Sequence, residues 1–207
     1  MAVSGWLVMT FCSVYIVGVV ARYLTFDPDV YFPEQRETYL RLQLALGVHV
    51  ACGVVALLIG PFQFARRLRR RFVRAHRVTG VLYVVSATGL AVSGLVLAPT
   101  AYTGPVAAAG FTVLGVGTLF TTWTALRTAL AHRYAEHRRW AILSFSLIFA
   151  GVMLRIWVPI YLALSGSGLV HFSFETAYAG IAWLCWVPNL LFAVWLTRRT
   201  VQRERAR

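Results

Sequence analysis

Six long apolar blocks occupy almost the whole of this 207-residue chain. A helix needs about 20 predominantly apolar residues to cross the hydrocarbon core of a bilayer. Each block reaches that length, and the chain is 59% hydrophobic and only 13% charged. The pattern predicts an all-α membrane protein, a bundle of six transmembrane helices that forms a single domain over residues 1–207. We expect the spans at about 3–24, 41–64, 77–98, 105–129, 139–162 and 174–197.

The arginines predict the orientation of this bundle. All 20 basic residues are arginine, and the formal net charge is +13. Those in the connections gather on one predicted side, while Arg22, Arg36 and Arg41 lie on the other. The positive-inside rule therefore predicts that both termini face the cytoplasm (N-in/C-in), in the cytoplasmic (inner) membrane of a bacterium. The arginines of the predicted cytoplasmic side are Arg66, Arg67, Arg69, Arg70, Arg71, Arg74, Arg77, Arg127, Arg133, Arg138, Arg139, Arg198, Arg199, Arg203, Arg205 and Arg207.

The same placement argues against nucleic acid as a partner. Arginines in short loops between spans contact anionic lipid headgroups and set topology, so the expected partners are the lipid bilayer and those headgroups. The three cysteines, Cys12, Cys52 and Cys185, lie in different apolar blocks and predict neither a zinc site nor a disulfide. The first block has no basic segment before it, so we expect it to remain in the mature protein.

Polar residues within the blocks recur at helical spacing and share faces with small residues. Polar groups are costly in lipid, and small residues let helices approach, so these faces are expected to meet inside the bundle. The second face contains His49 and Gln63, the third His76 and Tyr83, and the sixth Glu175 and Asn189. The fifth face is formed by His137, Ala141, Ser144, Ile148, Gly151 and Arg155.

Depth along the spans divides the candidates into two layers. His49 lies seven or eight residues from the predicted outer end of its span, roughly 10 Å at about 1.5 Å per residue, and Arg155 lies at a similar depth. His76 and His137 begin the third and fifth spans and share the cytoplasmic boundary. We therefore expect one polar site near each leaflet.

Arg155 is the most informative residue, because an arginine in the hydrocarbon costs at least about 3 kcal/mol on insertion scales. It either extends outward to the headgroups or faces an interior site, where it would hold an anion or a carboxylate such as Glu175. The fifth face favours the interior. His49 is either bonded to a neighbouring helix or acts as a ligand or proton carrier.

An ordered set of motifs resembles a known family. Gly60-Pro61-Phe62-Gln63-Phe64 is followed by His76-Arg77 with Gly80 and Tyr83, and later by His137, Trp140 and Arg155. This set is similar to that of the bacterial predicted membrane proteins called domain-of-unknown-function family 2306. The resemblance implies the membrane architecture and the choice of residues. No activity is attached to the family, so the reaction stays open.

Three functions fit these features. The first is a b-type haem or quinone-linked electron-transfer protein with a membrane redox partner, in which His76 and His137 would bind one haem iron and Arg77 and Arg138 its propionates. The second is an intramembrane enzyme or carrier for a small anionic amphiphile. Its site would contain His49 and Arg155, with further contacts from Gln63, Tyr83, Glu175 and Asn189. The third is an accessory subunit or homo-oligomer whose polar faces only pack helices.

Overall fold

The protein is built from helices and loops throughout the described part of the chain. The computed structural model describes residues 3–205, without the side chains of residues 3, 66, 67 and 200–205. Five arginines used in the orientation argument therefore lie outside the described side chains: Arg66, Arg67, Arg203, Arg205 and Arg207. The long helices are α1 (Val3–Val20), α3 (Gln43–Gln63), α5 (Val73–Leu97), α6 (Pro105–Leu130), α7 (Tyr134–Ile148), α8 (Ala150–Gly166), α9 (Phe174–Leu184) and α10 (Val187–Arg205).

Short helices cap the bundle at both ends. They are η1 (Ala21–Thr25), η2 (Pro28–Val30), η3 (Pro33–Gln35), α2 (Arg36–Arg41), α4 (Arg66–Arg71) and η4 (Ala98–Thr100). The connection 25–40 between the first two spans is thus folded into η2, η3 and most of α2. α4 consists almost wholly of arginine.

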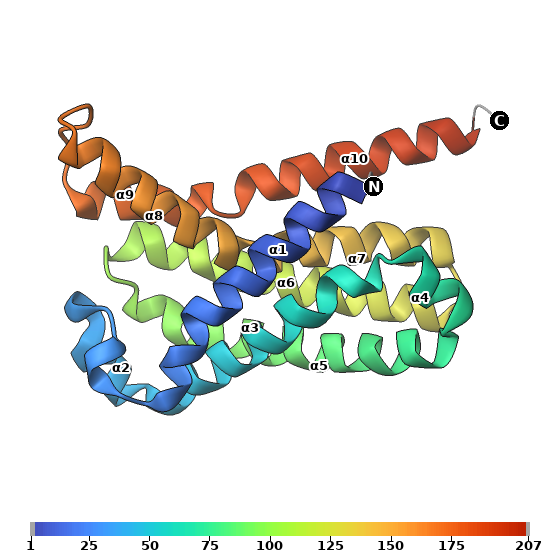
Figure 1. Cartoon of the computed structure of the whole chain (residues 1–207), viewed down its shortest axis with the longest axis horizontal. Helices are drawn as coiled ribbons and strands as arrows, with labels where there is room; N and C mark the ends of the chain where they lie inside the picture. Colours follow the sequence, from blue (N-terminus) through green and yellow to red (C-terminus); the bar gives the residue numbers. More distant parts are fainter. Residues whose placement is uncertain (1–2, 206–207) are drawn as a thin grey trace.

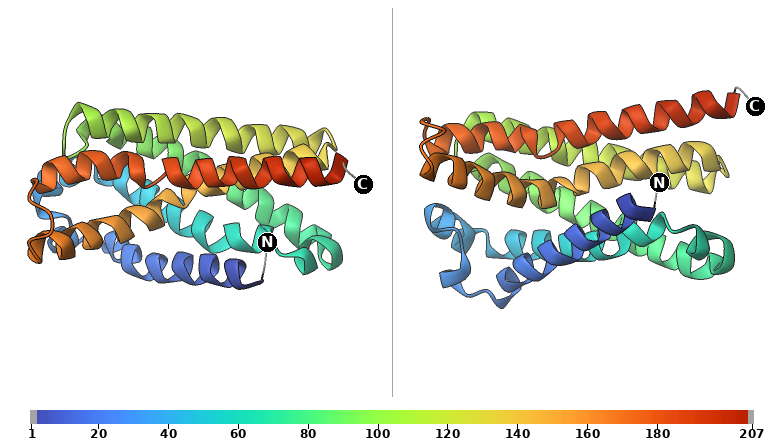
Figure 2. Two further views of the ribbon diagram at one scale, coloured as in Figure 1. Left: turned by 90° about the horizontal axis from the view of Figure 1, so that it is seen from above. Right: turned by 45° about the horizontal axis from the view of Figure 1, so that its top comes forward.

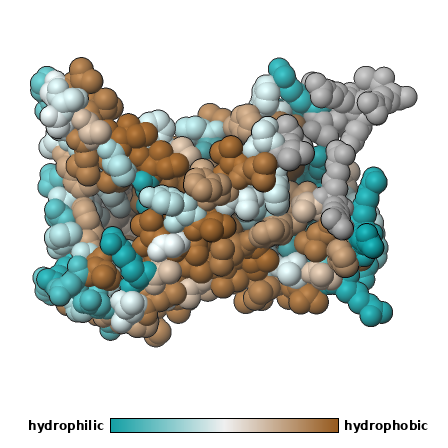
Figure 3. Space-filling model, viewed as in Figure 1, coloured by the Kyte–Doolittle hydropathy of each residue, from teal (hydrophilic) through white to brown (hydrophobic). Residues whose placement is uncertain are grey.

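Within the described residues 3–205, six segments are long and apolar enough to cross a membrane, which confirms the predicted number of spans. They run side by side along the long axis in Figure 1. Figure 3 shows apolar residues around the middle of this axis and hydrophilic residues towards its two ends. The spans are Ser4–Thr25, Gln43–Gln63, Val73–Thr100, Pro105–Leu130, Tyr134–Gly166 and Phe174–Arg199. The third and fifth begin earlier than predicted, because their helices continue into the arginine-containing loops.

The two ends of the bundle differ in charge. α4, the turn 131–133, the start of α1 and the end of α10 lie towards one end (Figure 1), which we call the arginine-rich end. η2, η3, α2, the turn 101–104 and the loop 167–173 form the opposite, arginine-poor end. Which end faces the cytoplasm stays a prediction.

Spans five and six are each divided into two helices, where the sequence analysis expected continuous ones. In span six, α9 ends at Leu184 and α10 begins at Val187. Pro188 explains this break, because its nitrogen carries no hydrogen for the Leu184 carbonyl and its ring crowds that carbonyl. At the break, the Trp186 N–H donates a hydrogen bond to the Trp183 carbonyl, three residues earlier, at 3.2 Å. The Asn189 side chain donates to the Cys185 carbonyl at 2.9 Å.

The break in span five has no proline at its position. α7 ends at Ile148, α8 begins at Ala150, and the first proline of the span is Pro159. At the turn, the Phe149 carbonyl accepts hydrogen bonds from the N–H groups of both Val152, at 3.0 Å, and Met153, at 3.1 Å. The bond from the Val152 N–H to the carbonyl three residues earlier tightens the first turn of α8, and the chain changes direction there.

The two breaks lie against each other. Leu147 and Ala150 flank the first, Cys185 and Trp186 form the second, and the four side chains make one buried cluster. Figure 2 shows both interruptions part-way along the bundle. Spans five and six therefore change direction at the same place.

Because of this change of direction, spans five and six have different neighbours in the two halves of the bundle. In the arginine-rich half, α7 packs against α6, and α10 packs on α7. In the arginine-poor half, α9 packs against α6, while α8 lies against α9 and α1. Four helices, α3, α5, α6 and α7, pack in sequence order and form the centre of the bundle.

Close packing between α3 and α7 yields a first prediction, at Gly60. A Cβ at Gly60 would overlap the ring of Phe145, a buried residue of α7. We expect Gly60→Ala to lower the stability of the folded protein by about 1–3 kcal/mol, because the close-packed ring must shift. Gly180→Ala is the matched control, since a Cβ there meets nothing within 4 Å. Unfolding in mild detergent measures both variants, and equal stabilities would contradict this packing argument.

Candidate functional site

A cavity of about 250 Å³ lies between the spans in the arginine-poor half. Helices α3, α5, α6 and α8 form its walls, and the residues around the two breaks form part of its inner surface. Tyr23 of η1, Tyr39 of α2 and Tyr102 of the 101–104 turn line its arginine-poor end. The apolar lining includes Leu46, Val50, Leu90, Leu114, Leu147 and Ile148.

The cavity exists because α8 leaves α6. The first half of span five, α7, packs along α6 in the arginine-rich half. The second half, α8, packs against α1 and α9 instead. Gly151 and Arg155 of α8 line the cavity. The neighbour exchange therefore positions the site.

Arg155 is the only arginine among the residues that line this cavity. One guanidinium nitrogen donates to the Gly151 carbonyl of its own helix at 3.0 Å. None of the ion pairs among the described residues involves Arg155, so none of the described carboxylates neutralises it. The cavity thus contains a cation whose remaining N–H groups can bind an anion.

His49 lines the same cavity from α3. Its Nδ1 lies 3.1 Å from the Leu90 carbonyl oxygen and 3.5 Å from the Ser93 hydroxyl. Because a carbonyl can only accept, Nδ1 carries the proton and Nε2 has the free lone pair. Gly94 allows this arrangement, since a Cβ there would lie 3.2 Å from the imidazole Cε1.

The structure therefore brings His49 and Arg155 to one cavity, while their common depth in the membrane stays a prediction. The two are from α3 and α8, which are separated by about a hundred residues in the chain. Their part in binding stays a prediction.

The sequence analysis missed four tyrosines of the cavity: Tyr23, Tyr39, Tyr102 and Tyr178. Burial and the neighbouring Tyr178 and Tyr23 hydroxyls raise the pKa of Tyr39 well above its ordinary value, while the Arg155 charge acts in the opposite sense. Tyr39 is thus a neutral hydroxyl that can donate a hydrogen bond near the cation. The stacked rings of Tyr23 and Tyr31, 5.8 Å apart, and the contact of Tyr31 with Tyr39 hold this group together.

Two predicted binding residues lie outside this cavity. The Tyr83 hydroxyl bonds to Ser144 at 3.0 Å, and Ser144 bonds to Thr122 at 2.8 Å, which links α5, α7 and α6 in the buried core. Gln63 donates to the Thr79 hydroxyl at 2.7 Å near the arginine-rich end. These contacts favour a structural part for both residues.

Glu175 and Asn189 are also absent from the cavity lining. Glu175 is exposed in the first turn of α9 and forms none of the ion pairs found among the described residues, so it does not pair with Arg155. Asn189 uses its amide at the break of span six. The sequence placed these residues on one face of a straight helix, which the break interrupts.

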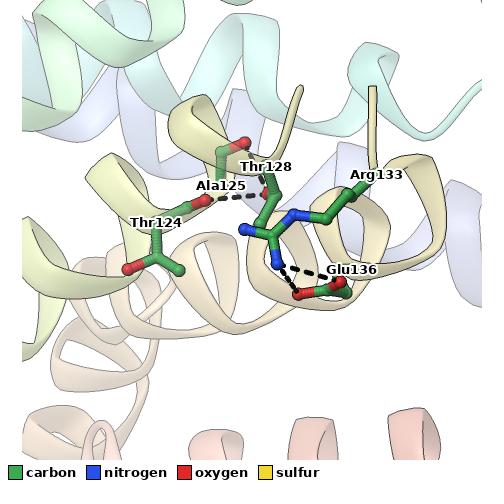
Figure 4. A network of polar contacts seen from close by, with 5 residues as sticks. All are labelled: Thr124, Ala125, Thr128, Arg133 and Glu136. Atoms are coloured by element: carbon green, nitrogen blue, oxygen red, sulfur yellow. Dashed lines mark hydrogen bonds and ion pairs between the residues drawn. The ribbon is translucent and has the colours of Figure 1, made fainter. Parts of the chain in front are cut away.

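His76 and His137 lie close enough to interact electrostatically, at the arginine-rich end. The His137 Nδ1 donates to the Ala125 carbonyl at 2.8 Å, and the same carbonyl accepts from Thr128 in Figure 4. The His76 Nδ1 is buried without a hydrogen-bond partner. The described residues contain no group of three or more histidine, cysteine, aspartate or glutamate side chains suited to a metal ion. Arg77 and Arg138 are exposed at this end.

Comparison with known proteins gives one match. Residues 46–197 match the family described as "Predicted membrane protein (DUF2306)". No curated protein and no solved structure matches the chain. The matched range includes His49, Arg155 and Tyr178, whereas Tyr23 and Tyr39 precede it.

The Tyr83–Ser144–Thr122 network yields a second prediction. Ser144→Ala should lower stability by about 1–2 kcal/mol, because it leaves two buried hydroxyls without their partner. Ser146→Ala is the control, since Ser146 bonds only within its own helix, to the Leu143 carbonyl. Detergent unfolding of both variants tests this, and a Ser144 variant as stable as the control would show that the network contributes nothing.

Proposed function

The chain belongs to the family of predicted membrane proteins (DUF2306), whose match covers most of its length, and from this premise we propose that it binds a small anionic amphiphile inside the membrane. The site is the cavity that contains Arg155 and His49. We further propose that the protein lies in the bacterial cytoplasmic membrane with this cavity in the outer half. The excess of arginine at the opposite end supports that orientation.

The unpaired charge of Arg155 carries this proposal. An arginine at membrane depth is costly and is found where it meets a counter-charge, a carbonyl or water. The Gly151 carbonyl satisfies only part of the guanidinium, and none of the described carboxylates pairs with it. A ligand with an anionic head would supply the missing counter-charge.

The lining of the cavity predicts how that ligand lies. Tyrosine hydroxyls and Arg155 can bind a polar head, and the apolar residues near the breaks, such as Leu114 and Leu147, can contact a short tail. Small-molecule sites commonly combine an apolar lining with a few polar groups that fix orientation. The volume of about 250 Å³ suits a head with a short apolar group.

His49 would contact the same head. The bond from Nδ1 to Leu90 leaves Nε2 as an acceptor, so the imidazole can receive a hydrogen bond or a proton from the ligand. Arg155 would then bind the anionic group of the ligand, while His49 would accept a hydrogen bond from a ligand hydroxyl or accept a proton.

Replacement of Arg155 tests this function and is our third prediction. Hexyl phosphate, an anionic probe, should bind the protein in nanodiscs about 10- to 100-fold more weakly after Arg155→Leu, because a charge-assisted bond at a buried site is lost. Arg155→Lys should retain part of the affinity. Titration calorimetry against empty nanodiscs measures binding.

Two controls accompany this experiment. Arg139→Leu removes an exposed arginine at the other end and should leave the affinity unchanged. Hexyl glucoside, an uncharged probe, should respond little to Arg155→Leu. A folded Arg155→Leu protein that binds hexyl phosphate like the unmodified protein would exclude the proposal and favour helix packing as the purpose of the polar faces.

The histidine pair favours a second candidate, one b-type haem at the arginine-rich end, and gives a fourth prediction. The fixed Nδ1 of His137 leaves Nε2 free as an iron ligand, an arrangement common in metal-ligating histidines. Protein expressed with ample haem should then show a Soret band that His137→Ala abolishes. A colourless protein would remove this candidate without affecting the cavity proposal.

A further inference from the structure

The carboxylates at the arginine-poor end fall into two groups. Asp29 pairs with Arg36 and Glu37 pairs with Arg41, so their charges are neutralised locally. Glu34 of η3 and Glu175 of α9 are both exposed, and none of the ion pairs among the described residues involves either of them. Asp27, which accepts a hydrogen bond from the Asp29 N–H, is also outside these ion pairs, so three described carboxylates at this end have no arginine partner.

Two of these carboxylates, Glu34 and Glu175, lie beside the cavity. Glu34 precedes Gln35, a lining residue, and Glu175 lies one helical turn before Tyr178, another lining residue. Between them is Tyr102, whose pKa is raised by partial desolvation and then by the charges of Glu175 and Glu34. Glu34 and Glu175 therefore lie near the Tyr102 hydroxyl, and Tyr102 lines the cavity.

Aromatic rings join these three elements. The Tyr102 ring lies 5.6 Å from Phe32, 5.9 Å from Phe174 and 5.9 Å from Tyr178, measured between centroids. Phe32 comes from the same loop as Glu34, and Phe174 is the neighbour of Glu175 in the sequence. An aromatic rim with two carboxylates therefore borders the cavity, and rings with nearby carboxylates are typical surroundings for ammonium groups.

The cavity consequently has two charged regions of opposite sign. The rim is negative, and Arg155, on the membrane-buried helix α8, is positive. A simple anion is attracted by Arg155 and repelled by the rim. A ligand with a cation towards the rim and an anion at Arg155 complements both regions.

We propose that the ligand is a zwitterionic amphiphile, in which an ammonium group lies at the Phe32–Tyr102–Phe174 rim beside Glu34 and Glu175, and an adjacent anion binds Arg155. The proposal rests on the function proposed above and specifies its substrate class. The ligand's short apolar tail follows the anion into the apolar part of the cavity. Ammonium, anion and tail thus lie in the same order as in a zwitterionic lipid.

Two probes of equal shape separate the effect of the cation from that of size. Hexyl phosphocholine carries the ammonium, whereas 3,3-dimethylbutyl hexyl phosphate has carbon in place of the nitrogen and is a simple anion. We expect the protein in nanodiscs to bind hexyl phosphocholine about tenfold more tightly, because the two rim carboxylates attract its ammonium group, whereas the carbon analogue has no cation at that position. Titration calorimetry against empty nanodiscs measures both affinities.

Substitution of the rim carboxylates locates the effect. Glu34→Gln with Glu175→Gln should abolish the preference for hexyl phosphocholine and leave the affinity for the carbon analogue unchanged or tighter. Glu37→Gln is the matched control at the same end, and its pairing with Arg41 predicts no change. Retention of the melting temperature would show that the variants are folded.

The outcomes distinguish the two proposals. Equal binding of both probes, or an equal loss of preference in Glu37→Gln, would overturn the zwitterion and leave the anion site intact. Binding of neither probe, or binding of both that Arg155→Leu does not weaken, would overturn the anion site itself. A preference that requires Glu34, Glu175 and Arg155 together would support both.

Discussion

The site depends on one constraint on the backbone, the interruption of spans five and six at the same depth. Inside a membrane an unsatisfied backbone group costs several kcal/mol, so a helix breaks only where other groups supply the lost bonds. Here the Asn189 amide binds the Cys185 carbonyl, and the Phe149 carbonyl accepts two N–H groups. The four residues beside the breaks are buried together, which keeps both turns away from lipid.

The interruptions give the bundle two different halves. In the arginine-rich half the four central helices pack closely, with Gly60 against Phe145 and the Tyr83–Ser144–Thr122 network between helices. In the arginine-poor half α9 takes the place beside α6, and α8 moves outward. Packing that is dense in one half and hollow in the other follows from the exchange of neighbours, and it leaves Arg155 at the edge of the hollow.

The sequence predicted the parts of this structure that depend on hydrophobic length and on helical spacing. The six spans follow from apolar length, and the prediction that His49 and Arg155 share a depth follows from counting residues from the outer ends of their spans. Pro188 could have indicated the break of span six, because a proline removes a backbone bond wherever it lies. Phe149 offers no such signal, since the turn depends on contacts with span six. The predicted binding role of Tyr83 and Asn189 rests on helical spacing, which shows which face a residue shares but not which partner it meets.

The tyrosines of the cavity could not be found from periodicity either, because three of them lie outside the long helices. Their presence changes the chemistry around Arg155. A carboxylate partner would neutralise the guanidinium and close the site, as a buried ion pair is satisfied by itself. Neutral hydroxyls can solvate the cation and still leave its charge uncompensated. The described acids at this end are at the surface, where Asp29 and Glu37 already have arginine partners. Separation of the buried cation from the surface carboxylates is therefore what leaves the cavity able to bind a charged ligand.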